Sequence, residues 1–305
     1  MSTRRSPSRY RRPVRNARIA LIAAALLAAG CISRDAGDGP APGAEATTTT
    51  AAAGGTSTTG PAGDLDRAAS VVTAWFRARG TYDWDRAAAL ATGPAAAFTT
   101  HLSVAHLVAG RTAPLPETPT VAVDFTAADR DGADVDVTGR VTVRWSDGGG
   151  EEFAGFRFVD AGPDLLLADY ANAAGPLSAH LVDGTTVAAA PAGDSGVDVA
   201  LVAAVWLAPD PVVAVTVRLG NGTDGPVGLA GDGVTFTPSP GDGPAVVADY
   251  GNGLDAPPGG TGWVLAELRG DPLPTGGGRL EVTVADADGA PLGTAALDLP
   301  AFPGA

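Results

Sequence analysis

The chain has 305 residues, with 34 acidic side chains, 20 arginines, no lysine and a single cysteine, and its formal net charge is −14. Such a charge repels phosphate backbones and anionic head groups, which argues against nucleic acid as a partner and against a basic membrane-binding patch. One cysteine excludes an intramolecular disulfide framework, so hydrophobic cores alone must hold the folded domains.

Residues 1–30 have the features of an export signal. Seven arginines precede an apolar run of twelve residues, from Ile19 to Gly30, which is shorter than the ~20 residues that a membrane-spanning helix needs. The small side chains of Ala29 and Gly30 suit a signal peptidase. We therefore predict a signal peptide over 1–30. General and twin-arginine export are both left open, because arginine pairs occur without the rest of the twin-arginine pattern.

The stretch Ala28-Ala29-Gly30-Cys31 resembles the lipobox of bacterial lipoproteins, in which a diacylglycerol is attached to the cysteine and the chain is cut before it. It departs from the usual pattern at Ala28, where leucine is most common. The resemblance implies an actinobacterial-type lipoprotein, anchored through Cys31 on the extracytoplasmic face of the cell membrane. The alternative is an ordinary signal peptide followed by a chance cysteine. Cleavage before Cys31 would leave a chain with a formal charge of −21.

Residues 31–63 are rich in threonine, alanine, glycine and proline, and Ile32 is their only apolar residue larger than alanine. Such a composition buries too little surface to offset the entropy of ordering the chain. We predict a lipidated cysteine followed by a disordered linker.

Three helices are predicted after the linker, over about 64–80, 83–91 and 94–109. Asp64 is a good N-cap for the first helix, and Gly80 is a good residue to end it. Asp83 is expected to cap the second helix. The first has one mainly apolar face at helical spacing, made of Leu65, Ala68, Ala69, Val72, Trp75, Phe76 and Arg79.

Four strands follow, over about 120–125, 135–145, 152–159 and 164–170. The second has the strongest alternation in the chain, with Val135, Val137, Val141, Val143 and Trp145 on one face. This order of helices and antiparallel strands, closing on FRFVDAGPDLLLADYAN, resembles the nuclear transport factor 2-like, or cystatin-like, superfamily over 64–182. The resemblance implies helices packed across a curved sheet in a cone. Many members insert a strand between the second and third helices, and Gly93-Pro94 leaves no room for it.

Beyond about residue 185 the pattern is all strands and turns. Several short apolar segments are separated by Gly, Pro, Asp and Asn, which is typical of a β-sandwich. The segments VRLGNGTDGPVGL and PPGGTGWVLAEL resemble immunoglobulin-like modules of Gram-positive lipoproteins. We therefore predict an α+β domain over 64–182 followed by an immunoglobulin-like β-sandwich over 183–305.

No catalytic or metal-binding motif is evident. His101 and His106 are five residues apart, which is wrong for a zinc pair on one helix face, and the acidic stretch 129–134 fits a hairpin turn better than a calcium loop. If the cone held a catalytic base, the candidates are Asp83, Asp124, Asp169 and, most seriously, His101. No cofactor and no metal are expected.

The cone would have an aromatic and aliphatic lining. The residues predicted to line a pocket are Trp75, Phe76, Phe98, His101, Leu102, Phe125 and Trp145. Such walls indicate a non-catalytic accessory or scaffold protein of the cell envelope that binds a protein partner or a small apolar ligand. Two alternatives are left open: an isomerase or dehydratase that uses the cone, and an accessory module in cell-wall synthesis, because penicillin-binding proteins have a similar N-terminal cone.

Overall fold

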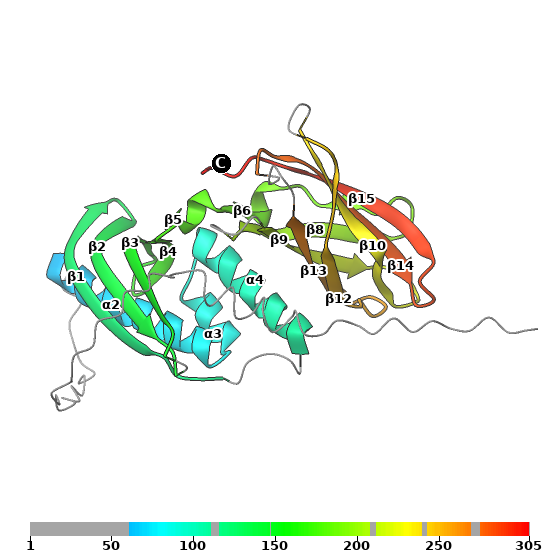
Figure 1. Ribbon diagram of the computed structural model, residues 1–305. Helices are drawn as coiled ribbons and strands as arrows, with labels where there is room; N and C mark the ends of the chain where they lie inside the picture. The colour runs from blue at the N-terminus through cyan, green and yellow to red at the C-terminus, as the bar shows by residue number, and fades with distance from the viewer. Residues whose placement is uncertain are drawn as a thin grey trace, which may run out of the picture.

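The computed structural model describes residues 61–110, 116–146, 148–207, 212–239, 243–269 and 275–304. The predicted signal peptide, Cys31 and nearly all of the predicted linker lie outside the described residues. Helices come first and antiparallel sheets follow, in the predicted order (Figure 1).

Three helices open the described chain: α2 (Pro61–Gly80), α3 (Trp84–Ala89) and α4 (Gly93–Ala109). Helix α2 begins three residues earlier than predicted, so Asp64 lies in its first turn, where a carboxylate also favours the helix dipole. Asp83 is the N-cap of α3, and its carboxylate accepts a hydrogen bond from the backbone N–H of Arg86 at 3.2 Å. A Cβ at Gly80 would lie 2.5 Å from the carbonyl oxygen of Glu117, so only glycine fits where α2 ends.

A five-stranded antiparallel sheet packs on these helices. Its order follows the sequence: β1 (Thr120–Asp131), β2 (Asp134–Arg144), β3 (Gly150–Asp160), β4 (Leu165–Asn172) and β5 (Gly175–Pro176). The acidic stretch 129–134 is the β1–β2 hairpin. The predicted alternation in β2 is confirmed, because Val135 and Val143 are fully buried while Asp136 and Arg144 are exposed. We call residues 61–176 the N-terminal unit.

Two further antiparallel sheets form the C-terminal unit, residues 181–304. One has the order β12-β13-β9-β8-β6, with β7 also paired to β8. Its strands are β6 (Leu181–Asp183), β7 (Ala190–Pro191), β8 (Val197–Trp206), β9 (Val212–Asn221), β12 (Tyr250–Leu254) and β13 (Thr261–Arg269). The other has the order β11-β10-β14-β15. Its strands are β10 (Val227–Pro238), β11 (Val246–Val247), β14 (Gly278–Asp286) and β15 (Pro291–Leu299).

The two sheets of the C-terminal unit share one hydrophobic core. It joins Val217 of β9 and Val264 of β13 to Phe236 of β10, Leu280 of β14 and Leu297 of β15. The predicted boundary at 182/183 falls inside β6. The connector between the units is therefore short, and it consists of the single 3₁₀ turn η3 (Leu177–Ala179) and His180.

Helix α4 joins the two units, and Figure 1 shows it between the five-stranded sheet and the strands of the C-terminal unit. The core around α2 and α4 also contains Leu181, Ala203, Val205 and Leu265 of the six-stranded sheet. That sheet is consequently buried on both faces. This explains the unbroken apolar run at the start of β9, where alternation would otherwise be expected.

Candidate ligand pocket at the junction of the units

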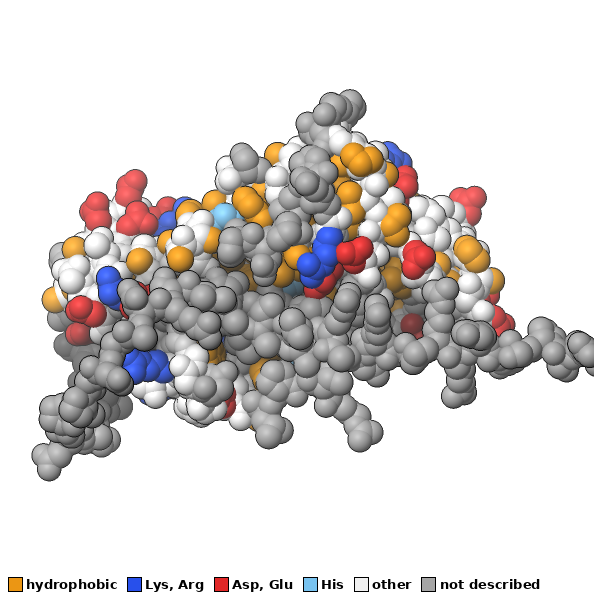
Figure 2. Space-filling model, viewed as in Figure 1, with side chains coloured by type: hydrophobic (Ala, Val, Ile, Leu, Met, Phe, Trp, Pro, Cys, Tyr) orange, Lys and Arg blue, Asp and Glu red, His pale blue; other side chains and the backbone are white. Residues whose placement is uncertain are grey.

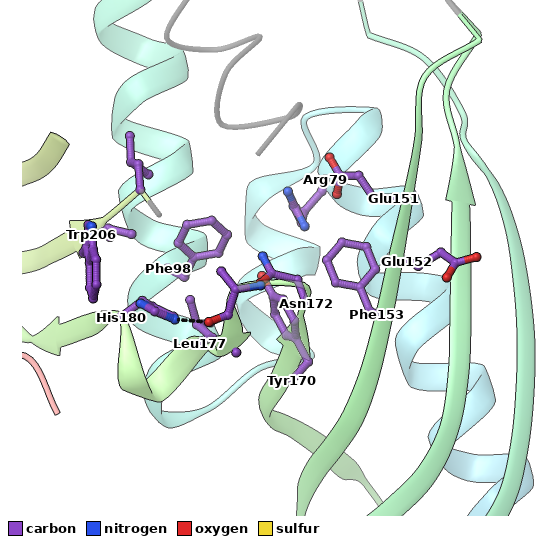
Figure 3. A pocket seen from close by; sticks show the side chains of 14 residues that line it. Arg79, Phe98, Glu151, Glu152, Phe153, Tyr170, Asn172, Leu177, His180 and Trp206 are labelled. Carbon is purple, nitrogen blue, oxygen red and sulfur yellow. Dashed lines mark hydrogen bonds between the residues drawn. The ribbon is translucent and has the colours of Figure 1, made fainter. Parts of the chain in front are cut away.

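A pocket opens between the N-terminal unit and the start of the C-terminal unit. It has a volume of about 70 Å³, on the scale on which a single water needs about 10–15 Å³. Helices α2 and α4, strands β3 and β4, the connector and the end of β8 all contribute to its wall (Figure 3). The lining residues are Arg79, Phe98, Glu151, Glu152, Phe153, Tyr170, Asn172, Ala174, Gly175, Leu177, His180, Val205, Trp206 and Leu207.

Arg79 is the most unusual of these side chains. It belongs to the last turn of α2 and is 4 % exposed. Its guanidinium carbon lies 4.6 Å from the ring centre of Trp75 and 5.7 Å from that of Phe98, so aromatic faces stabilise its charge. Its Nε and Nη1 nevertheless have no hydrogen-bond partner. Figure 3 shows the guanidinium directed into the space between Phe98 and Phe153.

Glu151 lies beside Arg79 and comes from β3. Its side chain is 8 % exposed and its Oε1 has no hydrogen-bond partner. Burial raises the pKa of this carboxyl to about 7, against the opposing effects of the Arg79 charge and the Trp145 indole. Arg79 and Glu151 interact electrostatically, but they form no ion pair in the part of the chain that the structure describes. The pocket thus holds a buried cation and a carboxyl that exchanges its proton near neutral pH.

Tyr170 and His180 are further polar residues of the wall. Burial raises the pKa of the Tyr170 phenol, and the nearby charge of Arg79 only partly opposes this. His180 donates a hydrogen bond from Nε2 to the carbonyl oxygen of Ala174 at 2.8 Å, and its ring edge meets Trp206 with ring centres 5.0 Å apart. The connector is therefore tied to both units where it borders the pocket.

The predicted pocket residues are brought together only in part. Phe98 lines the pocket, while Trp75 and Phe76 are fully buried and form the aromatic layer around Arg79. The others belong to the surrounding core without lining the pocket: Leu102, Phe125 and Trp145.

His101 faces away from this pocket. It is fully buried, and its Nδ1 is hydrogen-bonded to Oγ1 of Thr216 in β9 at 2.6 Å. The side chain therefore crosses to the C-terminal unit, instead of facing the sheet of the N-terminal unit as the cone hypothesis requires. Burial lowers the pKa of the imidazole to about 4, so it is neutral at pH 7.

The three acidic candidates also lie elsewhere. Asp83 caps α3, and Asp124 is exposed on β1. The carboxylate of Asp169 accepts hydrogen bonds from the backbone N–H groups of Tyr170 and Ser178, at 2.9 and 3.1 Å, and so holds the connector. Among the residues that the structure describes, no three His, Cys, Asp or Glu side chains form a group that could hold a metal ion.

Sequence reasoning overlooked Arg79 and Glu151 as site residues, although both left a signal. Arg79 continues the apolar face of α2 after Val72, Trp75 and Phe76, and Glu151 shares its face of β3 with the buried Phe153. A charged residue in the apolar phase of an element indicates a buried charge. The sequence does not show that α2 and β3 pack together. That packing brings the two side chains into one site.

Comparison with protein-family models, with curated proteins and with solved structures gives no match to this chain. No helix within the described ranges is both long and apolar enough to cross a membrane. Figure 2 shows acidic side chains scattered over the described part of the visible face, in its middle as well as at both ends. The pocket must therefore be interpreted from its own chemistry.

Proposed function

We propose that the chain is a non-catalytic binding protein of the bacterial cell envelope, anchored by a lipid on Cys31, whose junction pocket takes a small apolar ligand. In this proposal the N-terminal unit is a nuclear transport factor 2-like cone and the C-terminal unit an immunoglobulin-like sandwich. The element order, the packed antiparallel sheets and the lipobox-like stretch before Cys31 support it. The observation that carries it is a partly enclosed pocket with a mainly apolar wall.

The wall favours binding through buried area. Side chains from both units, including Phe98, Phe153, Leu177 and Val205, present carbon to the cavity. Each Å² of apolar surface that a ligand buries there contributes about 25 cal/mol. A few polar groups in such a wall set the orientation of the ligand.

One observation favours the enzyme alternative. Glu151, with a pKa raised to about 7, has the proton affinity of a general base working near neutral pH. An isomerase or dehydratase could use it to remove an acidic C–H proton from a bound substrate. A panel of ketosteroids and β-hydroxy thioesters tests this, and turnover that is lost in Glu151→Gln would replace the binding proposal by an enzyme.

The binding proposal is tested with 2-phenylethanol, a neutral ligand with one aromatic ring, by ligand-observed NMR on the chain from residue 31. Leu177→Trp fills the pocket from the connector, and we expect it to weaken binding at least tenfold. The matched control is Leu292→Trp at an exposed position of β15, which should leave binding unchanged. Equal binding by the wild type and Leu177→Trp would contradict the proposed site.

Anchoring is tested separately. In a bacterial host that lipidates exported proteins, the wild-type chain is expected in the membrane fraction and Cys31→Ala in the soluble fraction. A Cys31→Ala protein that has lost its signal peptide and still sediments with membranes would contradict lipid anchoring.

A further inference from the structure

We propose that the ligand of the junction pocket carries a carboxylate, which the guanidinium of Arg79 binds beside Glu151. This inference rests on the proposed binding function and specifies the chemical class of the ligand: a small apolar molecule with one carboxylate.

The first argument is the unmet hydrogen-bonding capacity of Arg79. A guanidinium cannot lose its charge in a protein, and a buried N–H without a partner is costly. Arg79 has two such nitrogens, Nε and Nη1, and its side chain lines the cavity. Its aromatic neighbours stabilise the charge but supply no acceptor oxygen. A ligand with acceptor oxygens supplies what the protein lacks.

The second argument selects a carboxylate among the possible anions. Its two oxygens lie in one plane and match the planar fork of a guanidinium. A phosphate brings more negative charge than one arginine offsets, and it would meet the carboxyl of Glu151 in the same pocket. The apolar rest of the wall suits a hydrocarbon tail. We therefore infer a monoanion with an apolar body.

The third argument concerns the charge of Glu151. The groups that interact with it are Arg79 from α2 and Tyr170 from β4. Glu152 and His180 lie elsewhere in the same wall, and Asp169 acts on Tyr170 from outside the lining. Ionised Glu151 competes with a ligand for Arg79, whereas protonated Glu151 is neutral and offers an O–H donor. Because burial raises the pKa of Glu151 to about 7, acidification from pH 8 to pH 6 leaves Arg79 free for the ligand. Binding of the ligand should therefore be accompanied by proton uptake.

The test compares phenylacetate with 2-phenylethanol and phenylacetamide, which are similar in shape but neutral, by calorimetry and ligand-observed NMR. We expect the wild type at pH 6 to bind phenylacetate at least tenfold more tightly than either neutral molecule. Arg79→Met keeps much of the side-chain bulk and should abolish this preference while retaining 2-phenylethanol. Arg77→Met, at an exposed position of the same helix, is the matched control and should change nothing.

The pH dependence tests the role of Glu151. Phenylacetate should bind the wild type more weakly at pH 8 than at pH 6, by up to about tenfold. Glu151→Gln should bind it at pH 8 as tightly as the wild type does at pH 6, with no further change on acidification. A dependence that persists in Glu151→Gln would assign the proton to another group and overturn this part of the inference.

The outcomes separate the two proposals. Binding of 2-phenylethanol without any preference for phenylacetate would overturn the carboxylate inference and leave the binding function standing. Absence of binding for all three molecules would contradict both. If Arg79→Met loses its circular dichroism signal, Arg79→Lys takes its place, because it keeps the charge and lacks the planar fork. An undiminished preference in Arg79→Lys would then contradict recognition by a guanidinium.

Discussion

Two places along α4 bury polar side chains at the junction of the units. In the middle of the helix, His101 meets Thr216 across the junction, with Nδ1 and Oγ1 2.6 Å apart. Near its start, Phe98 helps to surround Arg79, whose Nε and Nη1 have no partner. A histidine can become neutral when it is buried, whereas an arginine cannot. Nε2 of His101 has no partner either, but a neutral imidazole tolerates this better than a charged guanidinium. We call the first place the closed part and the second, which borders the pocket, the open part.

The largest change in the free energy of unfolding is expected from a charge placed inside the closed part. Ala214 in β9 is fully buried, and it shares a face of the strand with Thr216, whose hydroxyl meets His101 of α4. Ala214→Asp should lower the free energy of unfolding by about 4 kcal/mol or more, because an isolated buried carboxylate has no compensating partner. Urea unfolding measures this. Ala122→Asp, at an exposed position of β1, is the control; equal losses for the two variants would contradict burial of this face.

Removal of the histidine should have the next largest effect. His101→Ala leaves a cavity and takes away the partner of Thr216, so we expect a loss of about 2 to 4 kcal/mol at pH 7. Thr100→Ala on the same helix, at a half-buried position, is expected to cost less. A His101→Ala protein as stable as the wild type would show that the junction does not depend on this contact.

The same histidine predicts a pH dependence. Its pKa is about 4 in the folded chain, below the ordinary value of 6.5, so it stabilises the fold fully above pH 6.5 and loses this contribution as the pH falls toward 4. The loss approaches about 3 kcal/mol at pH 4. The difference in unfolding free energy between the wild type and His101→Gln isolates it. A difference that does not change between pH 7 and pH 4 would contradict a neutral buried imidazole.

The smallest change in the free energy of unfolding, a gain and not a loss, is expected from Glu151 in the open part. The pKa of Glu151 is raised to about 7, so its contribution to stability is greatest below pH 4.5 and is lost as the pH rises through 7. Glu151→Gln should therefore stabilise the chain at pH 8, by about 1 to 2 kcal/mol after allowance for partial solvation, and progressively less toward pH 4. Thermal unfolding at both pH values tests this, with the exposed Glu152→Gln as control. A destabilised Glu151→Gln would indicate a structural role instead.

The sequence predicted the helices and the long strands because each shows its own periodicity. The alternation in β2 and the apolar face of α2 depend on burial on one side only, and both are confirmed. The short strands β6, β7, β11 and β12 were missed, since two to five residues carry no readable period. Strand β9 is buried on both faces, so its sequence begins with a continuous apolar run. Such a run does not predict which element covers each face of the strand.

The pocket was less predictable than the elements that form it. Its charged groups come from α2 and β3. Its far wall comes from the end of β8, where Val205 and Trp206 lie more than fifty residues after Glu151. His101 was expected to face the sheet of its own unit, but the structure turns it toward Thr216 because α4 is covered on both sides. A single helix period cannot show which of two buried faces meets which partner.

The connector has a consequence for how the molecule melts. The carboxylate of Asp169 holds the N–H of Ser178, the carbonyl oxygen of His180 accepts from Trp206 at 2.8 Å, and that of Ala179 accepts from Gly304 at 2.9 Å. Both units thus form hydrogen bonds with the same short connector. Unfolding of either unit would break bonds that also hold the other. Calorimetry should accordingly show one cooperative transition, with equal calorimetric and van't Hoff enthalpies, for a chain whose sequence reads as two separate modules.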